Sequence, residues 1–227
     1  MTEVPGSVLF DLDGTLTDPF IGITRSMQHA LRQMGMDPPP AEELRRYIGP
    51  PLQATFMEIF GDEALAAKAL GFYRQRYGEF GKFENELIPG IIDVLRTMTD
   101  TGYALFVATS KLESYSLDII DHFGLAGYFR RVHGSALDGS RADKGELIRH
   151  ILRAEGLDPQ KTVMIGDRLH DAHGAARNDV RAIGVLWGFG DRAELEGAGA
   201  ARIAASPAEL PEMVCAMIGL TRSAGQV

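Results

Sequence analysis

The sequence contains only one cysteine, Cys215, among its 227 residues. A single cysteine cannot form an internal disulfide, and the sequence has neither an N-glycosylation sequon nor a Cys/His cluster with zinc-ligand spacing. No apolar run reaches membrane-spanning length, and the short polar stretch before Val8 contains no signal-peptide core. We therefore expect a cytoplasmic protein with no membrane partner.

The sequence also lacks an excess of positive charge, since 23 Lys and Arg face 31 Asp and Glu, for a net charge of −8. No global field attracts a polyanion, so we expect no nucleic-acid partner, and any anionic ligand needs a local site. Hydrophobic residues make up 45% and charged residues 24% of the chain, which excludes disordered and coiled-coil classes. The length indicates one large domain or a core with an inserted module.

Five short apolar runs have the composition of strands buried on both faces of a sheet. They are Val8–Phe10, Ala104–Ala108, Val163–Ile165, Ala182–Leu186 and, more weakly, Arg202–Ala204. Segments with helical spacing lie between them, at 91–98, 112–123, 144–154 and 172–178, and Gly102, Gly124 and Gly156 follow three of these as C-cap candidates. This alternation predicts an α/β fold, with a Rossmann-like parallel sheet and helices on both faces.

The stretch from about residue 20 to residue 86 shows no strand-like run. It is typical of helices interrupted at proline and glycine turns, such as Gly49-Pro50-Pro51. The stretch begins directly after the first strand, and Ile88-Pro89-Gly90 marks the return of the α/β pattern. We therefore predict an α/β core of residues 1–17 and 88–227 and an inserted all-helical domain of residues 18–87.

The segment Asp11-Leu12-Asp13-Gly14-Thr15 places two carboxylates two residues apart, directly after the first strand. A polar turn at the end of a strand is the alternative interpretation, because Asp, Gly and Thr are common turn residues. Two close acids can act as nucleophile and general acid/base, a division that suits phosphoryl transfer. Mg²⁺ prefers carboxylate and phosphate oxygens, so the same acids indicate a magnesium site.

Two further sites follow other predicted strands, and a third opens a predicted helix. Asp167 and Asp171 lie one helical turn apart and can share a metal, although a helix-capping arrangement is equally expected. Thr109 and Ser110 can donate to a phosphate oxygen or cap the next helix. Lys144, at the start of a predicted helix, can pair with a phosphate and the nucleophile, or lie solvated on the surface.

In this order the sites resemble those of the haloacid dehalogenase-like (HAD) hydrolases, and the resemblance spans nearly the whole chain. The insertion after the first strand is similar to the helical cap of the phosphoglycolate phosphatase-like branch. Three stretches look most like the 5'-nucleotidase-type members of that branch: Tyr47–Leu52, Ala108–Lys111 and Gly134–Arg141.

The resemblance implies that Asp11 attacks phosphorus to form an aspartyl-phosphate. Asp13 would protonate the leaving oxygen and later activate water, while Thr109 and Lys144 would hold the phosphoryl oxygens. Mg²⁺ would be held by the Asp11 carboxylate, the Asp13 backbone carbonyl and Asp167, with Asp171 acting directly or through water. Further candidates for substrate or phosphate binding are Gly14, Thr15, Ile48, Gly49, Ser110, Lys111 and Arg141.

Two other patterns in the sequence could indicate a binding site, and each has an alternative interpretation. Gly188-Phe189-Gly190 and Ala193 fit the G-x-G-x-x-A pattern of a dinucleotide site, but they follow a late strand rather than the first, so we expect a glycine-rich turn. Arg45, Arg46 and Arg141 can meet a second anionic group of a substrate, or lie solvated on the surface.

The resemblance thus implies a Mg²⁺-dependent phosphomonoesterase that hydrolyses a small phosphorylated metabolite, either a 5'-nucleotide or phosphoglycolate. The sequence does not determine the oligomeric state, and we expect a monomer. Asp13 favours phosphate esters, because the dehalogenases and phosphonate hydrolases of this superfamily resemble one another in lacking an acid at that position. A sugar-phosphate mutase and a non-catalytic phosphometabolite-binding protein stay open as alternatives.

Overall fold

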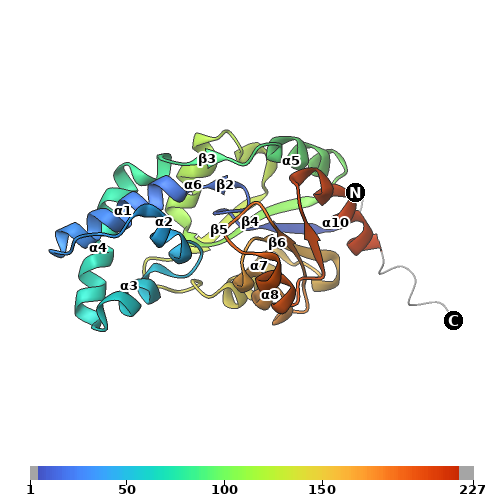
Figure 1. Ribbon diagram of the computed structural model, residues 1–227. Coiled ribbons are helices and arrows are strands. Elements are labelled where there is room, and N and C mark those ends of the chain that lie inside the picture. Colours follow the sequence, from blue (N-terminus) through green and yellow to red (C-terminus); the bar gives the residue numbers. More distant parts are fainter. Residues whose placement is uncertain (1–4, 220–227) are drawn as a thin grey trace.

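The computed structural model describes residues 5–219, so the predicted core range extends past the described residues at both ends. Its centre is a six-stranded sheet with the order β5-β4-β1-β6-β7-β8, in which all neighbours pair in parallel (Figure 1). The strands are β1 (Ser7–Phe10), β4 (Ala104–Leu112), β5 (Arg131–Ser135), β6 (Thr162–Gly166), β7 (Arg181–Val185) and β8 (Arg202–Ala204). The predicted parallel α/β fold is confirmed.

Helices cover both faces of this sheet. Successive side chains of a strand point to opposite faces, so each buried strand presents apolar side chains to the helices on both sides. Val8 and Phe10 of β1 belong to one apolar cluster, which also contains residues of α5 (Ile91–Asp100), α6 (Glu113–His122) and α10 (Leu210–Gly219). Leu9 belongs to the opposite cluster, together with residues of α7 (Lys144–Glu155) and α8 (Leu169–Ala176). The short helix α9 (Arg192–Gly197) precedes β8.

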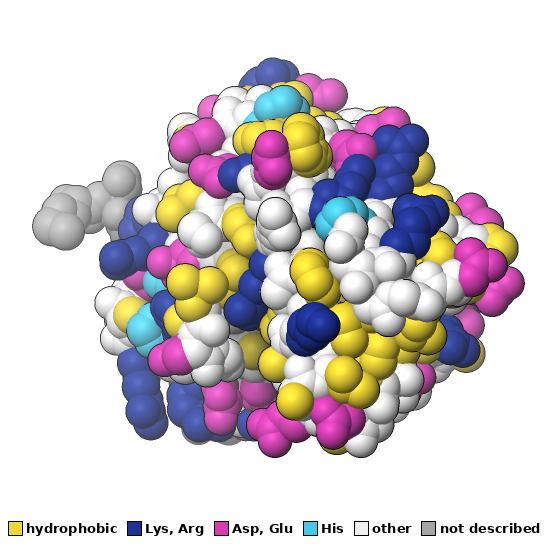
Figure 2. All heavy atoms as spheres, turned by 90° about the vertical axis from the view of Figure 1, so that its left-hand side faces the viewer, with side chains coloured by type: hydrophobic (Ala, Val, Ile, Leu, Met, Phe, Trp, Pro, Cys, Tyr) yellow, Lys and Arg dark blue, Asp and Glu magenta, His cyan; other side chains and the backbone are white. Residues whose placement is uncertain are grey.

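The residues between the first strand and α5 form a helical insert, defined here as residues 20–83. It contains α1 (Phe20–Gln33), α2 (Ala41–Leu44), α3 (Leu52–Phe60) and α4 (Glu63–Glu79), with short 3₁₀ turns η1 (Arg45–Tyr47) and η2 (Gly81–Phe83). The insert has its own apolar cluster, which includes Met27, Phe56 and Tyr73. It lies beside the sheet at the left of Figure 1, and Figure 2 shows this end, where hydrophobic side chains are exposed among charged ones of both signs.

Two short strands connect the insert to the sheet. β2 (Thr17–Asp18) and β3 (Glu86–Leu87) pair antiparallel, with Thr17 opposite Leu87. The chain therefore leaves the core and returns to it through one two-stranded ribbon. This ribbon begins only four residues after Asp13, so the loop that carries Asp13 and the connection to the insert are continuous.

Several predicted elements differ in extent from the observed ones. β5 was not predicted, because only Val132 in this edge strand is a typical strand residue. β2 and β3, with two residues each, are too short to give an alternating pattern. The helices α9 and α10 were also not predicted. Gly102, Gly124 and Gly156 have the positive φ values expected next to helix ends.

Additional 3₁₀ turns connect the core elements: η3 (Ala126–Tyr128), η4 (Pro159–Lys161) and η5 (Pro207–Glu209). Among residues 5–219, none of the helices combines the length and the apolar character that a bilayer crossing requires. Cys215 is exposed on α10.

Candidate active site

The predicted site residues meet at the carboxyl edge of the sheet. Asp11 follows β1, Thr109 lies in the last part of β4, and Asp167 follows β6. β1 pairs with both β4 and β6, so these three strand ends are neighbours. Open α/β sheets bind ligands outside the carboxyl ends of the strands, at the point where the strand order reverses. The sheet therefore brings together residues more than 150 positions apart in the sequence.

Lys144, the first residue of α7, connects three parts of this edge. Its Nζ lies 2.9 Å from Asp11 Oδ1 and 2.8 Å from Asp171 Oδ1, and it donates to the carbonyl of Ala108 at 2.9 Å. The side chain is 4% exposed. Burial alone would lower the pKa of Lys144, but the two carboxylates raise it above its ordinary value, so the ammonium keeps its charge.

Asp11, Asp167 and Asp171 form a buried acidic cluster, in which one oxygen of each lies within 4.8 Å of the others. Burial, and then the charges of Asp11 and Asp171, raise the pKa of Asp167 well above its ordinary value. Burial also raises the pKa of Asp171, to about 6, against the opposing charge of Lys144. Asp11 and Asp171 therefore share the Lys144 ammonium, whereas Asp167 lies beside them without a cation of its own among the described residues.

This cluster fits a divalent cation. Among residues 5–219, Asp167 Oδ1 is buried and has no hydrogen-bond partner. An unpaired buried carboxylate oxygen is costly, whereas hard cations such as Mg²⁺ take carboxylate oxygens as ligands. Asp11, Asp167 and Asp171 are the residues that would hold such an ion.

Three glycines leave room around the Asp167 carboxylate. A Cβ at Gly14 would lie 2.2 Å from Asp167 Oδ2, and one at Gly188 would lie 2.3 Å from the Asp167 Cβ. A Cβ at Gly190 would lie 2.1 Å from the Asp167 carbonyl oxygen. Between the last two glycines, the backbone N–H of Phe189 donates to Asp167 Oδ2 at 2.8 Å. The predicted glycine-rich turn thus packs on Asp167, a role that its spacing did not indicate.

Asp13 is paired with a cation from the end of β4. Lys111 Nζ lies 2.7 Å from Asp13 Oδ2, and it also donates to Tyr77 Oη of α4 at 2.5 Å. Burial raises the pKa of Asp13, against the charge of Lys111 and with a further contribution from Asp11.

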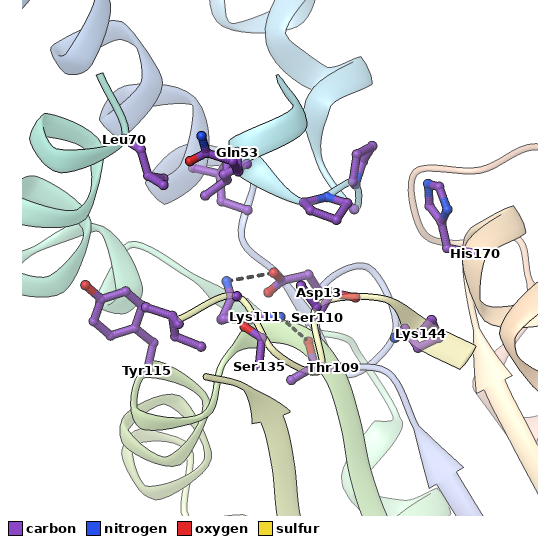
Figure 3. Close-up of a pocket in the computed structure, with 18 of the residues that line it drawn as sticks. Asp13, Gln53, Leu70, Thr109, Ser110, Lys111, Tyr115, Ser135, Lys144 and His170 are labelled. Atoms are coloured by element: carbon purple, nitrogen blue, oxygen red, sulfur yellow. Dashed lines mark hydrogen bonds and ion pairs between the residues drawn. The ribbon is translucent and has the colours of Figure 1, made fainter. Parts of the chain in front are cut away.

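A cavity of about 420 Å³ opens above these groups, between the sheet edge and the helical insert. This size falls in the range of about 300–1,000 Å³ usual for small-molecule sites. In Figure 3, Asp13, Lys111 and Thr109 lie on the core side, and Gln53 and Leu70 approach from the insert. Four tyrosines also line the cavity: Tyr47, Tyr73, Tyr77 and Tyr115.

Some of the predicted site residues line the cavity, and others lie outside its lining. Those that line the cavity are Asp11, Asp13, Gly49, Thr109, Ser110, Lys111, Lys144 and Asp171. Asp167 is fully buried beside Asp11 and Asp171. Gly14, Thr15, Ile48 and Arg141 are not among the lining residues. Gly14 has a φ of +80° in the turn after Asp13, and the carbonyl of Thr15 accepts from Trp187 Nε1 at 3.1 Å.

The arginines proposed for a second anionic group are engaged elsewhere. The Arg45 guanidinium lies 4.9 Å from the centroid of the Phe189 ring, and Arg46 Nη2 donates to Tyr47 Oη at 2.6 Å. Arg141 pairs with Glu113 at 3.3 Å. None of the three lines the cavity.

Sequence reasoning did not single out Tyr77, Arg168 or Glu194. Arg168 follows Asp167 directly, and its Nη1 donates to the carbonyl of Ile48 in the insert. Its Nε donates to Glu194 of α9 at 2.8 Å. Arg168 stands directly after the predicted site residue Asp167, and this position was a usable signal. Tyr77 and Glu194 give no such signal in the sequence, because only the folded chain brings them to the site.

The fold and this acidic edge define a class of α/β enzymes that act at the carboxyl end of a parallel sheet. Residues 8–185 match the family model of the haloacid dehalogenase-like hydrolases, and the chain belongs to this family.

A 5'-nucleotidase from Pseudomonas aeruginosa is 48% identical over 190 residues, which are 83% of this chain and 86% of the relative. The crystal structure of a predicted phosphatase from Clostridium acetobutylicum has a TM-score of 0.90 and 40% identity, covering 94% of this chain and all of that one. The tyrosine-protein kinase PtkA of Mycobacterium tuberculosis is 38% identical over 83% of this chain, which spans only 64% of that relative. The protein is a phosphoric monoester hydrolase of the HAD-like family.

Proposed function

We propose that the protein is a Mg²⁺-dependent phosphomonoesterase that works through an aspartyl-phosphate on Asp11. The observation that carries the proposal is the pairing of Lys144 with both Asp11 and Asp171 beside the unpaired oxygen of Asp167. In the proposal, Asp11 is the nucleophile, Lys144 is a fixed cation, and Asp167 and Asp171 join Asp11 as metal ligands at the same edge. Positioning and charge stabilisation are the main contributions that a protein makes to phosphoryl transfer.

In the proposed reaction, a carboxylate oxygen of Asp11 attacks phosphorus, and the bond from phosphorus to the ester oxygen breaks. Asp13 donates its proton to the departing oxygen, so the alcohol leaves neutral. Asp13 then accepts a proton from the water that attacks the aspartyl-phosphate, which releases phosphate and regenerates both acids. Thr109 and Ser110 donate to the phosphoryl oxygens, together with the Lys144 ammonium. A bound Mg²⁺ would supply further stabilisation of the phosphoryl charge.

We also propose that residues 18–87 act as a cap domain that closes over the substrate. The two-stranded ribbon of β2 and β3 is the connection about which this domain would move. Gly49 and Leu52 of the insert line the same cavity as Asp11, so the substrate would contact both parts of the chain. Closure would exclude bulk water from the aspartyl-phosphate.

Within this class we propose a 5'-nucleotide as the substrate. Tyr115, the least buried of the four tyrosines that line the cavity, offers a stacking surface for a base. Of the cations that line it, Lys111, Lys144 and Arg168 are each held by protein oxygens, and Arg74 is the remaining one among the described residues. The carboxylate of phosphoglycolate would therefore meet few unengaged cations. The 5'-nucleotidase from P. aeruginosa supports the same choice.

The test is phosphate release from nucleoside 5'-monophosphates, phosphoglycolate and sugar phosphates, with Mg²⁺ or with chelator, using Asp11→Asn as the blank. We expect Mg²⁺-dependent release concentrated on the nucleotides. A preference for phosphoglycolate would contradict the substrate proposal and point to Arg74 as the carboxylate partner. Turnover by Asp11→Asn at near-native rates would contradict the mechanism. The expectations of a monomer, of a cytoplasmic location and of no nucleic-acid partner stay predictions.

A further inference from the structure

The carboxylate of Asp13 is held at one oxygen and free at the other. Lys111 Nζ contacts Oδ2 at 2.7 Å, whereas Oδ1 is buried and has no hydrogen-bond partner among residues 5–219. The Asp13 side chain is 14% exposed and lines the cavity. Figure 3 shows the contact between the Lys111 ammonium and Asp13. This contact therefore determines which Asp13 oxygen is available to a substrate.

The ammonium of Lys111 is itself positioned by Tyr77. Lys111 Nζ donates to Tyr77 Oη at 2.5 Å and lies 4.6 Å from the centroid of the Tyr77 ring. The Lys111 side chain is only 7% exposed, so few other orientations are open to it. A phenol oxygen together with a ring face is a directional site for an ammonium group.

Tyr77 is rigidly packed. It is 1% exposed, its ring stacks on Tyr73 with centroids 5.3 Å apart, and Tyr115 lies 5.5 Å away. Tyr77 belongs to α4 of the insert, whereas Asp13 and Lys111 belong to the core. The chain of contacts from Tyr77 to Asp13 therefore crosses from the insert to the core.

We infer that Tyr77 is a positioning residue for the general acid/base: it holds Lys111, which holds Asp13 with Oδ1 directed to the substrate's leaving oxygen. The inference rests on the proposed role of Asp13 in proton transfer. Because Tyr77 lies on the insert, Asp13 is correctly oriented only while the insert is docked on the core. Proton transfer is thereby coupled to the closed arrangement of the two parts.

The test exploits leaving-group chemistry. Tyr77→Phe removes the hydroxyl but keeps the ring beneath the ammonium, so the cavity keeps its shape. p-Nitrophenolate leaves as a stable anion and needs little help from an acid, whereas a nucleoside alkoxide needs a proton. The ratio kcat/KM reports the steps up to departure of the leaving group. We expect kcat/KM for a nucleoside 5'-monophosphate to fall about fivefold, the equivalent of one hydrogen bond, and that for p-nitrophenyl phosphate to fall less than about twofold.

A double-mutant cycle tests whether Tyr77 acts through Lys111. In a Lys111→Met background, Tyr77→Phe has no further target, so we expect it to leave kcat/KM for the nucleotide unchanged within about 1.5-fold. A direct contact between Tyr77 and the substrate predicts the opposite: the same loss in both backgrounds and with both leaving groups. That result would overturn the inference.

Two variants separate this inference from the proposed function. Asp13→Asn should lower kcat/KM for the nucleotide by about 100-fold or more, and a small effect would refute the role of Asp13 itself. If Asp13→Asn has its large effect but Tyr77→Phe shows no leaving-group dependence, only the positioning role fails. Tyr128→Phe, in the core turn η3 that precedes β5 and outside the cavity lining, is the matched control for loss of a phenol hydroxyl, and we expect it to leave both ratios unchanged.

Discussion

Arg168 Nη1 donates a hydrogen bond to the backbone carbonyl of Ile48. Arg168 belongs to the core and follows Asp167 directly, whereas Ile48 belongs to the insert and precedes Gly49, a residue that lines the cavity. Glu194 fixes the same guanidinium through a 2.8 Å contact with Nε. The candidate metal-binding loop and the substrate-facing turn of the insert are thus joined by one side chain.

Replacing Arg168 should loosen this junction. We expect Arg168→Ala to lower kcat/KM about tenfold, because a charge-assisted hydrogen bond contributes about 1.5 kcal/mol or more and its loss frees the turn at Gly49. Glu194→Gln keeps an oxygen acceptor for Arg168 Nε and should cost less. Arg192→Ala, on the same helix as Glu194 and 57% exposed, is the control. An Arg168→Ala enzyme with native kcat/KM would show that the contact does not position the turn.

The acidic cluster should be more stable without one of its charges. Asp167→Asn keeps an oxygen acceptor for the N–H of Phe189 but removes a buried charge next to Asp11 and Asp171. We expect the metal-free variant to melt about 2–4 °C above the metal-free wild type, the shift that about 1 kcal/mol gives for a domain of this size. Like-charge crowding is the physical reason.

The same variant should lose its response to metal. Mg²⁺ at about 100 times its Kd would stabilise the wild type by about 2.7 kcal/mol, whereas Asp167→Asn should show little shift. Thermal unfolding with Mg²⁺ and with chelator measures both effects. Asp121→Asn, an exposed acid on α6, controls for the loss of one negative charge. A metal-induced shift of native size in Asp167→Asn would remove Asp167 from the ligand set.

Sequence patterns predicted part of this candidate site because some of its residues come directly after a strand or open a helix. Asp11, Asp167 and Lys144 sit at such positions, and a parallel sheet brings all strand ends to one edge. Tyr77 lies in the last turn of α4, where a buried aromatic is ordinary core composition. Its contact with Lys111 depends on how the insert docks, which no local pattern encodes.

The fold shows the same division between local and tertiary information. Buried strands such as β6 have an apolar composition that marks them in the sequence, and Thr162–Gly166 contains the predicted Val163–Ile165. The edge strand β5 is held by pairing with β4, although Arg131 and His133 give it no strong strand pattern. The register that places Val132 opposite Val107 is a tertiary property.

Removal of Lys144 should destabilise the protein as well as inactivate it. Lys144→Met leaves Asp11 and Asp171 buried together without their cation, and breaking a buried ion pair at one partner costs about 3–5 kcal/mol. Urea unfolding at pH 7 without metal measures this cost. Lys68→Met, on the exposed side of α4, should stay within about 0.5 kcal/mol of wild type. A cost below about 1 kcal/mol for Lys144→Met would contradict the ion-pair network.

Glu84, which lies between the insert and β3, should make the stability of the connection depend on pH. A hydrogen bond from Arg76 lowers the pKa of Glu84 below its ordinary value of 4.5, against the effect of burial, and Arg25 adds a second hydrogen bond. The distances are 2.8 Å from Arg76 Nη1 to Oε2 and 2.8 Å from Arg25 Nη1 to Oε1. The folded state therefore binds its proton more weakly than the unfolded state does.

A group with a lowered folded-state pKa stabilises the protein above its unfolded-state pKa, and this stabilisation is lost as the pH falls through the folded-state value. Glu84→Gln should thus cost about 1–2 kcal/mol at pH 7 and progressively less as the pH falls from about 5 to below 4. Urea unfolding at several pH values compares it with wild type. Glu196→Gln removes a surface partner of Arg192 that is 58% exposed, and it should have little effect at any pH. A cost for Glu84→Gln that does not change with pH would show that packing, not charge, is what Glu84 contributes.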